Sequence, residues 1–217
     1  MRLLVLILSV SLAVAWPAAS GVAAEIKIGV AEALTGNAAQ YGMPIRKGFE
    51  LAVGEINGGG GINGNKLELV IEDEQGKKEE AINVFKKLIF QDKVLMLFGP
   101  TLSNSAQASD PVAQSAQIVV FGTSNTADGI TSIGNYVFRN SVTEADILPV
   151  TLKVTSQKTG LKKVAVLYGN DDIFTKSGYD NFVKALQALK IPVATTESFA
   201  KGAIVMTTKG HQYVIQK

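Results

Sequence analysis

A run of five apolar residues, Val94–Phe98, constrains the fold more than any other feature of this sequence. Such a run, cut off by Gly99-Pro100, is typical of a strand that is covered on both faces in a parallel sheet. The residues from Ser103 to Ala116 predict a helix, in which Ser103 stands at the N-cap position. This part of the chain is therefore predicted to form a strand–turn–helix unit.

The start of this predicted helix is a natural receptor for a carboxylate group. The backbone N–H groups of a first helical turn have no partner inside the helix, and the helix dipole adds partial positive charge there. The hydroxyl of Ser103 either caps the helix or reaches a ligand, and the local sequence leaves both roles open.

The same alternation of strand and helix extends over residues 25–121. Alternating apolar residues predict the strands and helical spacing predicts the helices, with Pro44 at the first position of one helix. In order, the predicted elements are strand 25–31, helix 44–58, strand 66–71, helix 79–91, strand 94–98, helix 103–116 and strand 118–121. Their short connections indicate an α/β fold with a doubly wound parallel sheet and right-handed crossovers.

Sheets of this kind bind ligands outside the carboxyl ends of their strands. The loops predicted at those ends are 34–43, 73–77, 99–103 and 122–128, and three of the four consist mainly of small hydroxyl and amide residues. That chemistry suits an adaptable polar pocket. Tyr41 and Phe174 lie in loops at strand ends of two different units. Ordinary packing explains either ring alone, whereas as a pair they would close on a ligand from opposite sides.

A second unit follows a short strand at 136–139, and we place a hinge near 140–144. It is predicted to hold helix 143–159, strand 164–168, helix 175–189 and strand 193–199, followed by a terminal β-hairpin of 203–208 and 212–215. About two β–α repeats are too few for a full second core. The expected domains are an N-terminal Rossmann-like lobe, 25–142, a partial second lobe, 143–202, and the hairpin, 203–217.

Residues 1–24 have the pattern of an export signal. Arg2 precedes an apolar run from Leu3 to Val14, and Val22-Ala23-Ala24 fits the small residues that precede a cleavage site. The run is shorter than the roughly 20 residues that a membrane-spanning helix needs. We therefore expect export, with cleavage after Ala24, and a soluble product.

Composition excludes several classes of function. Once Arg2 is removed, 20 of the 21 basic side chains remain against 19 acidic ones, so the chain lacks the positive field that nucleic acid requires. Its lack of cysteine excludes disulfides, thiolate metal sites and a cysteine nucleophile. No nucleophile elbow is present, and His211 lacks partners for a triad or a zinc site. We expect neither an enzyme nor a bound cofactor.

Three further patterns are interpreted as ordinary turns and loops. Gly59–Gly64 has the spacing of a dinucleotide-binding fingerprint, but a predicted helix precedes it and a predicted strand follows it. This order is the reverse of what the fingerprint needs, so the segment predicts a turn. The acidic runs Glu72–Glu74 and Asp171-Asp172 are interpreted as surface loops rather than metal sites.

Four segments together resemble a known family. They are Thr35–Gly42, Glu55–Gly64, Gly99–Ser103 and Thr123–Thr126, which occur in the order and spacing of that family. Each is weak alone, but the four in order are specific. The chain resembles the branched-chain amino-acid (leucine-binding-protein-like) type of periplasmic solute-binding protein, the receptor component of an ABC importer, from its signal segment to about Gly202.

The resemblance implies a type I periplasmic-binding-protein fold, in which two Rossmann-like lobes close over a ligand. It implies that the Ser103 hydroxyl binds the carboxylate of a branched-chain amino acid or an aromatic acid. Ser124 and Thr126 would add backbone and hydroxyl bonds, Tyr41 would line the side-chain pocket, and Phe174 falls close to the aromatic residue of the second lobe. The implied partner is an ABC permease in the membrane, and we expect a monomer in the periplasm.

The resemblance also implies that part of the second lobe is lacking. Family members are nearly twice as long, and after Phe199–Gly202 this chain continues directly with the terminal hairpin of the family. The lacking part includes the acidic residue that pairs with the ligand ammonium in amino-acid-binding members. The alternatives to a functional binding protein are a sensory module of the same fold and a truncated remnant that does not bind.

Overall fold

A computed structural model describes residues 25–200, 204–206 and 212–214. The predicted signal segment, the turn at 209–210 and His211 lie outside the described residues. Among the described residues, no helix combines the length and apolar character that crossing a membrane requires.

Five parallel strands form the first sheet, in the order β2-β1-β3-β4-β5. The strands are β1 Glu25–Glu32, β2 Lys66–Asp73, β3 Met96–Phe98, β4 Val119–Gly122 and β5 Val137–Arg139. The connecting helices are α1 Ala39–Gly58, α2 Lys78–Lys86 with its π-helical extension Lys87–Gln91, α3 Ser103–Ala116 and the 3-10 turn Thr131–Ile133. The structure thus confirms the predicted doubly wound parallel sheet.

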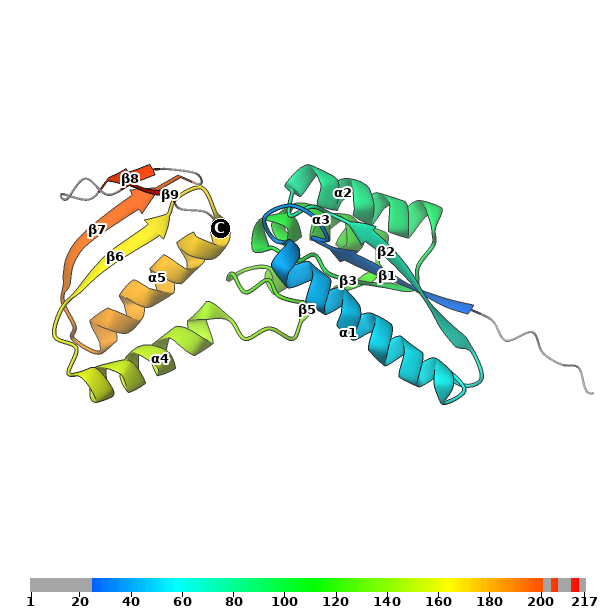
Figure 1. The fold of residues 1–217 in the computed structure, drawn as a ribbon, viewed down its shortest axis with the longest axis horizontal. Coiled ribbons are helices and arrows are strands. Elements are labelled where there is room, and N and C mark those ends of the chain that lie inside the picture. Colours follow the sequence, from blue (N-terminus) through cyan, green and yellow to red (C-terminus); the bar gives the residue numbers. More distant parts are fainter. Residues whose placement is uncertain (1–24, 201–203, 207–211, 215–217) are drawn as a thin grey trace, which may run out of the picture.

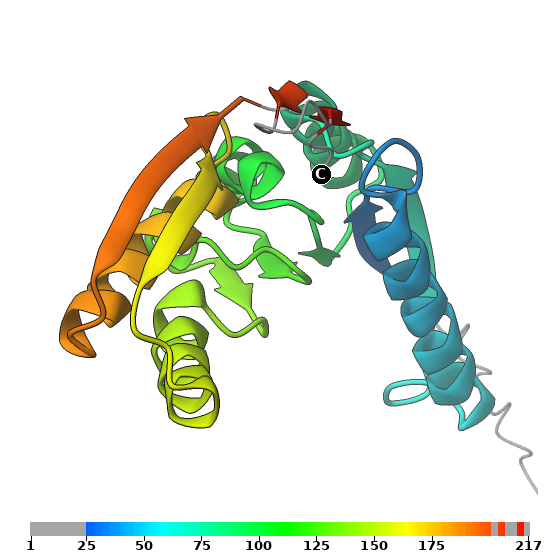
Figure 2. The same ribbon diagram turned by 60° about the vertical axis from the view of Figure 1, so that its left-hand side comes forward.

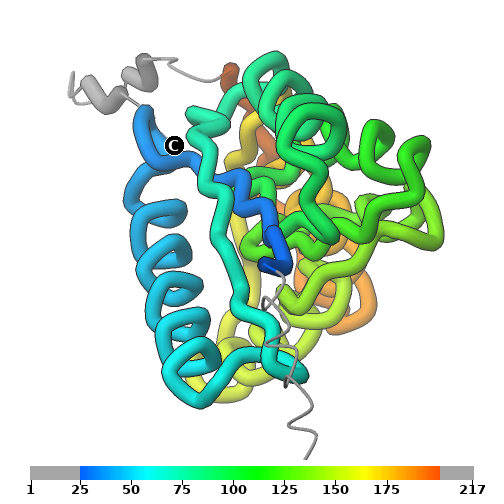
Figure 3. The backbone as a smooth tube through the Cα atoms, turned by 90° about the vertical axis from the view of Figure 1, so that its right-hand side faces the viewer, coloured from blue at the N-terminus to red at the C-terminus, as the bar shows by residue number. Residues whose placement is uncertain are grey.

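The two faces of this sheet are covered to different extents. Helix α1 lies on one face, and α2 and α3 lie on the other (Figures 1 and 3). The main core lies on the α2/α3 face, where Phe85, Leu88 and Leu97 are fully buried. On the α1 face, Phe98 contacts Phe49 with ring centroids 4.6 Å apart, and Phe138 at the sheet edge remains 46% exposed.

The expectation that the run 94–98 is covered on both faces is therefore only partly correct. Val94 and Leu97 are buried, Phe98 is half-buried, and Leu95 is 65% exposed. The strand itself comprises only Met96–Phe98. A continuous apolar run does not distinguish a strand with two covered faces from one whose second face is partly open.

The start of α1 and the N-cap of α3 differ from the prediction. Helix α1 begins at Ala39 rather than at Pro44, because Ala39 and Tyr41 already donate turn hydrogen bonds to the carbonyl groups of Gly36 and Ala38. Pro44 therefore lies inside the helix. Helix α3 has its predicted bounds, but Leu102 is its N-cap and Ser103 is its first helical residue.

The glycine-rich segment after α1 is a turn. Gly59–Gly64 forms a turn with an isolated bridge between Ile62 and Asn65, as predicted. Within the described part of the chain, no group of three or more acidic or histidine side chains is placed to hold a metal ion.

The second unit has a small sheet. It comprises α4 Glu144–Thr159, β6 Val164–Gly169, α5 Ile173–Ala188 and β7 Val193–Phe199, and β6 pairs in parallel with β7 (Figure 2). Its core consists of Leu152, Val166, Ala185, Leu186 and Ile191. Strand β7 is exposed up to Ser198. A two-stranded sheet with an open face is consistent with an incomplete second lobe.

The predicted terminal hairpin is present as two short paired strands. They are β8 Ile204–Met206 and β9 Gln212–Val214, which pair antiparallel. The predicted hinge near 140–144 coincides with the segment between β5 and α4, where the chain leaves the first sheet (Figure 1). Its role as a hinge stays a prediction.

A close approach between α1 and the end of β1 gives a prediction on stability. A Cβ atom added at Gly42 would lie 2.2 Å from the carbonyl oxygen of Ala33, whereas one added at Gly48 would meet nothing within 4 Å. We expect Gly42→Ala to lower the free energy of unfolding by about 2 kcal/mol or more in urea titrations. The matched Gly48→Ala should raise it by about 0.5–1 kcal/mol. Equal stability of the two variants would contradict the observed packing.

Asp110 of α3 gives a second prediction, on pH dependence. Its side chain is 1% exposed, its Oδ1 has no hydrogen-bond partner among the described residues, and burial raises its pKa to about 8. The folded state therefore holds a proton that the unfolded chain releases above its ordinary pKa of 3.8. This contribution to the unfolding free energy falls by about 1.4 kcal/mol per pH unit between roughly pH 4 and 8.

We expect Asp110→Asn to make the profile less steep by the contribution of Asp110, while the buried carboxyl groups of Glu32 and Glu74, whose pKa values burial also raises, keep theirs. Chemical denaturation at several pH values between 4 and 8 measures it, with the exposed Glu55→Gln as the control that retains the wild-type profile. An Asp110→Asn protein with the same profile as the wild type would show that Asp110 is not protonated in the folded state.

Candidate functional site

A cavity of about 220 Å³ lies at the carboxyl ends of β3 and β4, bounded on its far side by α5. It is lined by Tyr41, Thr101, Leu102, Ser103, Ser124, Thr126 and Phe174. The structure thus brings together all five residues that the sequence predicts as ligand contacts. Their role in binding a ligand stays a prediction.

Four different segments supply these side chains. Tyr41 lies in the first turn of α1, and Ser103 begins α3. Ser124 and Thr126 follow β4, and Phe174 lies in the first turn of α5, in the second unit. Parallel strands place their carboxyl ends along one edge of the sheet, so loops that are far apart in the sequence meet there.

Ser103 joins the two loops that follow β3 and β4. Its side chain is 3% exposed, and its Oγ accepts hydrogen bonds from the backbone N–H groups of Thr126 at 3.2 Å and Ala127 at 3.3 Å. A hydroxyl oxygen accepts two hydrogen bonds and donates one. Both acceptor positions are therefore used, and only the proton of Ser103 remains to be donated.

The first turn of α3 adds backbone donors next to that proton. Leu102, the N-cap residue, makes no side-chain capping hydrogen bond. The N–H groups of the first helical turn also have no carbonyl partner within the helix, and the positive end of the helix dipole is located there. The site therefore offers hydrogen-bond donors and partial positive charge without a basic side chain among its lining residues.

The hydroxyl groups of Ser124 and Thr126 are already engaged within the protein. Ser124 Oγ donates to the carbonyl oxygen of Thr101 at 2.7 Å, which leaves the lone pairs of Ser124 Oγ to accept a hydrogen bond. Thr126 Oγ1 donates to the carboxylate of Glu144. The expected backbone and hydroxyl bonds from Thr126 to a ligand would thus require it to exchange its present partners.

Polar contacts between the first sheet and the second unit surround the cavity. Glu144, at the start of α4, is 6% exposed and accepts from Ser177 Oγ at 3.0 Å in addition to Thr126. The carboxylate of Asp128 accepts from Asn181 Nδ2 at 2.7 Å. Apart from Thr126, sequence analysis did not identify these residues as part of the site, because the partners of each pair come from separate elements and have no recognisable spacing.

Two buried carboxyl groups lie behind the cavity, and sequence analysis missed them as functional candidates. Glu32 and Glu74 are both 0% exposed. Burial raises the pKa of Glu32 to about 7, and it also raises that of Glu74. The interpretation of Glu72–Glu74 as a surface loop is therefore wrong: Glu72 and Asp73 are the half-buried end of β2, and the Oε2 of the buried Glu74 accepts from Ser105 at 2.9 Å.

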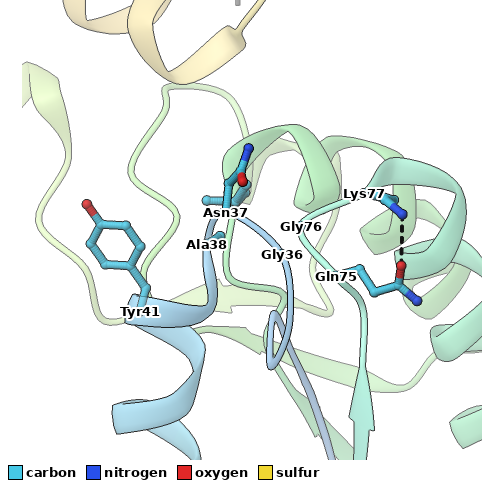
Figure 4. Close-up of a pocket in the computed structure, with 8 residues that line it drawn as sticks. Gly36, Asn37, Ala38, Tyr41, Gln75, Gly76 and Lys77 are labelled. Atoms are coloured by element: carbon cyan, nitrogen blue, oxygen red, sulfur yellow. Dashed lines mark hydrogen bonds between the residues drawn. The ribbon is translucent and has the colours of Figure 1, made fainter. Parts of the chain in front are cut away.

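A second cavity, of about 190 Å³, lies beside the first at the ends of β1 and β2 (Figure 4). The two cavities share Tyr41 and Leu102. Lys77 lies on the side opposite Tyr41, where its Nζ donates to Gln75 Oε1 at 2.9 Å. Tyr41 therefore lies between a cavity that hydroxyl groups line and a cavity whose lining includes the ammonium group of Lys77.

A third cavity, of about 400 Å³, lies in the second unit. It shares Phe174 with the first cavity, and its lining includes Tyr168 and Tyr179, whose rings stack with centroids 4.1 Å apart. Phe174 therefore separates a cavity that several hydroxyl groups line from one that aliphatic and aromatic side chains mainly line.

Comparison with known proteins identifies a family over most of the chain. Residues 25–204 match the model of the periplasmic binding protein family. The leucine-, isoleucine-, valine-, threonine- and alanine-binding protein of Pseudomonas aeruginosa is 34% identical over 160 residues, which are 73% of this chain and 43% of that protein. The Leu/Ile/Val-binding protein of Escherichia coli K12 is 30% identical over 147 residues, 67% of this chain and 40% of that protein.

Solved structures of solute-binding proteins have a similar fold. The branched-chain amino acid substrate-binding protein LivJ of Streptococcus pneumoniae, in complex with isoleucine, superposes with a TM-score of 0.77 and 31% identity over 82% of this chain and 51% of that one. A solute-binding protein of Rhodopseudomonas palustris with 3,4-dihydroxybenzoic acid has a TM-score of 0.73 at 23% identity, over 81% of this chain and 47% of that one, and shows the fold alone.

The chain spans less than half the length of these two curated relatives and about half that of the solved structures, which is consistent with an incomplete second lobe. Proteins of this group bind solutes and are not enzymes. The chain belongs to the periplasmic binding protein family.

Proposed function

We propose that this protein is an exported solute-binding protein of an ABC importer and that it binds a small carboxylate ligand, a branched-chain amino acid or an aromatic acid. The observation that carries the proposal is the cavity that Tyr41, Ser103, Ser124, Thr126 and Phe174 line together. The relatives bind leucine, isoleucine and valine by name, and the solved structures hold isoleucine or a dihydroxybenzoic acid.

Binding begins with the carboxylate at the start of α3. The free proton of Ser103 and the first-turn N–H groups of this helix hold the ligand oxygens, because charge-assisted hydrogen bonds to a carboxylate are stronger than neutral ones. Ser124 Oγ, whose proton is bonded to Thr101, accepts a hydrogen bond from the ligand. The rings of Tyr41 and Phe174 enclose the apolar part.

The second unit closes over the ligand, and polar contacts at the border between the two units support the closed arrangement. The hydrogen bonds of Glu144 to Thr126 and of Asn181 to Asp128 join the two units near the cavity, and Ser177 holds Glu144 from within the second unit. A ligand that contacts both units favours the closed arrangement by its differential affinity for that state. The membrane permease recognises the closed form, and the protein works as a monomer in the periplasm after cleavage at Ala24.

Calorimetric titration of residues 25–217 with leucine, isoleucine, 4-hydroxybenzoate and 3,4-dihydroxybenzoate tests this function. We expect saturable heat with at least one of the four, because both proposed ligand classes carry the carboxylate that the site is built to hold. If none gives heat while the chain is folded by circular dichroism, the binding function is wrong and the chain is a remnant that does not bind.

Ser103→Ala tests the assignment of the carboxylate. Removing the hydroxyl removes a hydrogen bond to a charged group, so we expect the dissociation constant to rise about 10- to 100-fold. Ser109→Ala is the matched control, because Ser109 is a buried serine of the same helix whose Oγ donates to the carbonyl oxygen of Ser105. An unchanged affinity in Ser103→Ala would place the carboxylate elsewhere.

A further inference from the structure

The carboxylate of Glu32 joins three strand ends under the cavity. Glu32 is the last residue of β1, which lies between β2 and β3 in the sheet. Its Oε2 accepts from Thr101 Oγ1 at 2.5 Å, and its Oε1 accepts from Thr123 Oγ1 at 2.7 Å. One buried carboxylate thus connects the end of β1 to the loops that follow β3 and β4.

Each of these threonines leads directly to a residue that lines the cavity. Thr101 precedes Ser103 by two residues, and its carbonyl oxygen accepts from Ser124 Oγ at 2.7 Å. Thr123 immediately precedes Ser124. Thr101 Oγ1 also accepts from the backbone N–H of Ala33 at 2.8 Å, so its hydroxyl is fixed on both sides.

We propose that Glu32 is a positioning residue for the cavity: its ionised carboxylate holds the hydroxyl groups of Thr101 and Thr123 and thereby sets the relative placement of Ser103 and Ser124. Glu32 itself does not line the cavity. Its effect on affinity rests on the proposed binding function, whereas its effect on the two loops does not.

A carboxylate suits this position because both of its oxygens accept hydrogen bonds. A protonated carboxyl group has a hydroxyl on one oxygen, which favours donation there, and a glutamine presents an NH₂ group in the same place. Either change puts a donor in place of one acceptor, so one of the two threonine hydroxyls must reorient to accept from it. The arrangement in which both threonines donate to Glu32 therefore exists only while Glu32 is ionised.

The surroundings of Glu32 make this state sensitive to pH. Among the described residues Glu32 has no ion-pair partner, and its charged neighbour is Glu74, which follows β2 and repels it. Thr101 and Thr123 face it from the loops after β3 and β4 and favour the ionised form. Burial outweighs these hydrogen bonds and raises the pKa of Glu32 to about 7, so the carboxylate forms as the pH rises through neutrality.

Backbone ¹⁵N–¹H NMR spectra of the ligand-free protein between pH 5.5 and 8.5 test the loop placement directly. We expect the amide signals of Ala33, Thr126 and Ala127 to shift together with a midpoint near pH 7, because all three donate to Thr101 or Ser103. In Glu32→Gln this transition should be absent. Glu74→Gln distinguishes the two buried acids, since it should retain the transition and lower its midpoint.

Affinity measured by calorimetry with 4-hydroxybenzoate and with leucine tests the consequence for binding. In the wild type, affinity should fall as the pH is lowered from 8 to 6, and Glu32→Gln should bind about tenfold more weakly with a flat profile. Thr123→Val should weaken binding similarly. The double variant should be weakened by less than the sum of the two single effects, because both substitutions act on the Glu32–Thr123 hydrogen bond.

The NMR and calorimetry experiments distinguish failure of the positioning role of Glu32 from failure of the proposed binding function. A transition near pH 7 that persists in Glu32→Gln would falsify the positioning role. So would a Glu32→Gln protein that loses thermal stability but keeps wild-type affinity and its pH profile. If the wild type binds neither probe, the binding function fails, while the NMR titration still decides whether Glu32 places the loops. Glu55→Gln, on the exposed part of α1, should match the wild type in every measurement.

Discussion

Two hydrogen bonds to the Ser103 hydroxyl hold the end of β3 and the end of β4 together, at 3.2 Å from Thr126 N and 3.3 Å from Ala127 N. The rest of the site depends on this contact, because it brings the first turn of α3 beside the loop that carries Ser124. It also fixes the chemistry of the site, since a hydroxyl whose acceptor positions are filled has only a proton to offer. A negatively charged group is the natural partner of that proton and of the neighbouring backbone donors.

Behind this contact lies a layer of buried polar groups that is unusual for the core of a parallel sheet. Glu32, Glu74, Thr101 and Ser105 are all at most 1% exposed and are linked by hydroxyl donors. Burying a carboxyl group is costly unless it is hydrogen-bonded, so such groups persist where they serve a purpose beyond packing. In front of the contact, Glu144 and Asp128 connect the same loops to α4 and α5. The cavity thus lies between a layer of buried polar groups and a border where these polar contacts join the apolar packing of Ile173 against the first core.

The errors of the sequence analysis share a physical origin. Pro44 satisfies the rules for a first helical residue, yet α1 starts at Ala39 because Gly42 allows the helix to pack closely against Ala33. Leu95 belongs to an apolar run but is 65% exposed, because periodicity records hydrophobicity and not coverage. Glu74 belongs to an acidic run but turns inward towards Ser105. In each case the surroundings of the residue in the folded protein, which the local pattern does not record, decide the outcome.

The sequence by itself determined the order of strands and helices, the parallel sheet and the set of polar loops at the carboxyl ends of its strands. These follow from local patterns of hydrophobicity, glycine and proline, and from the rule that parallel strands share one ligand-binding edge. Only the tertiary structure decided which donors stay free and which acids are buried. Those properties depend on partners such as Glu32 and Thr123, which are 91 residues apart, and no local pattern records such a contact.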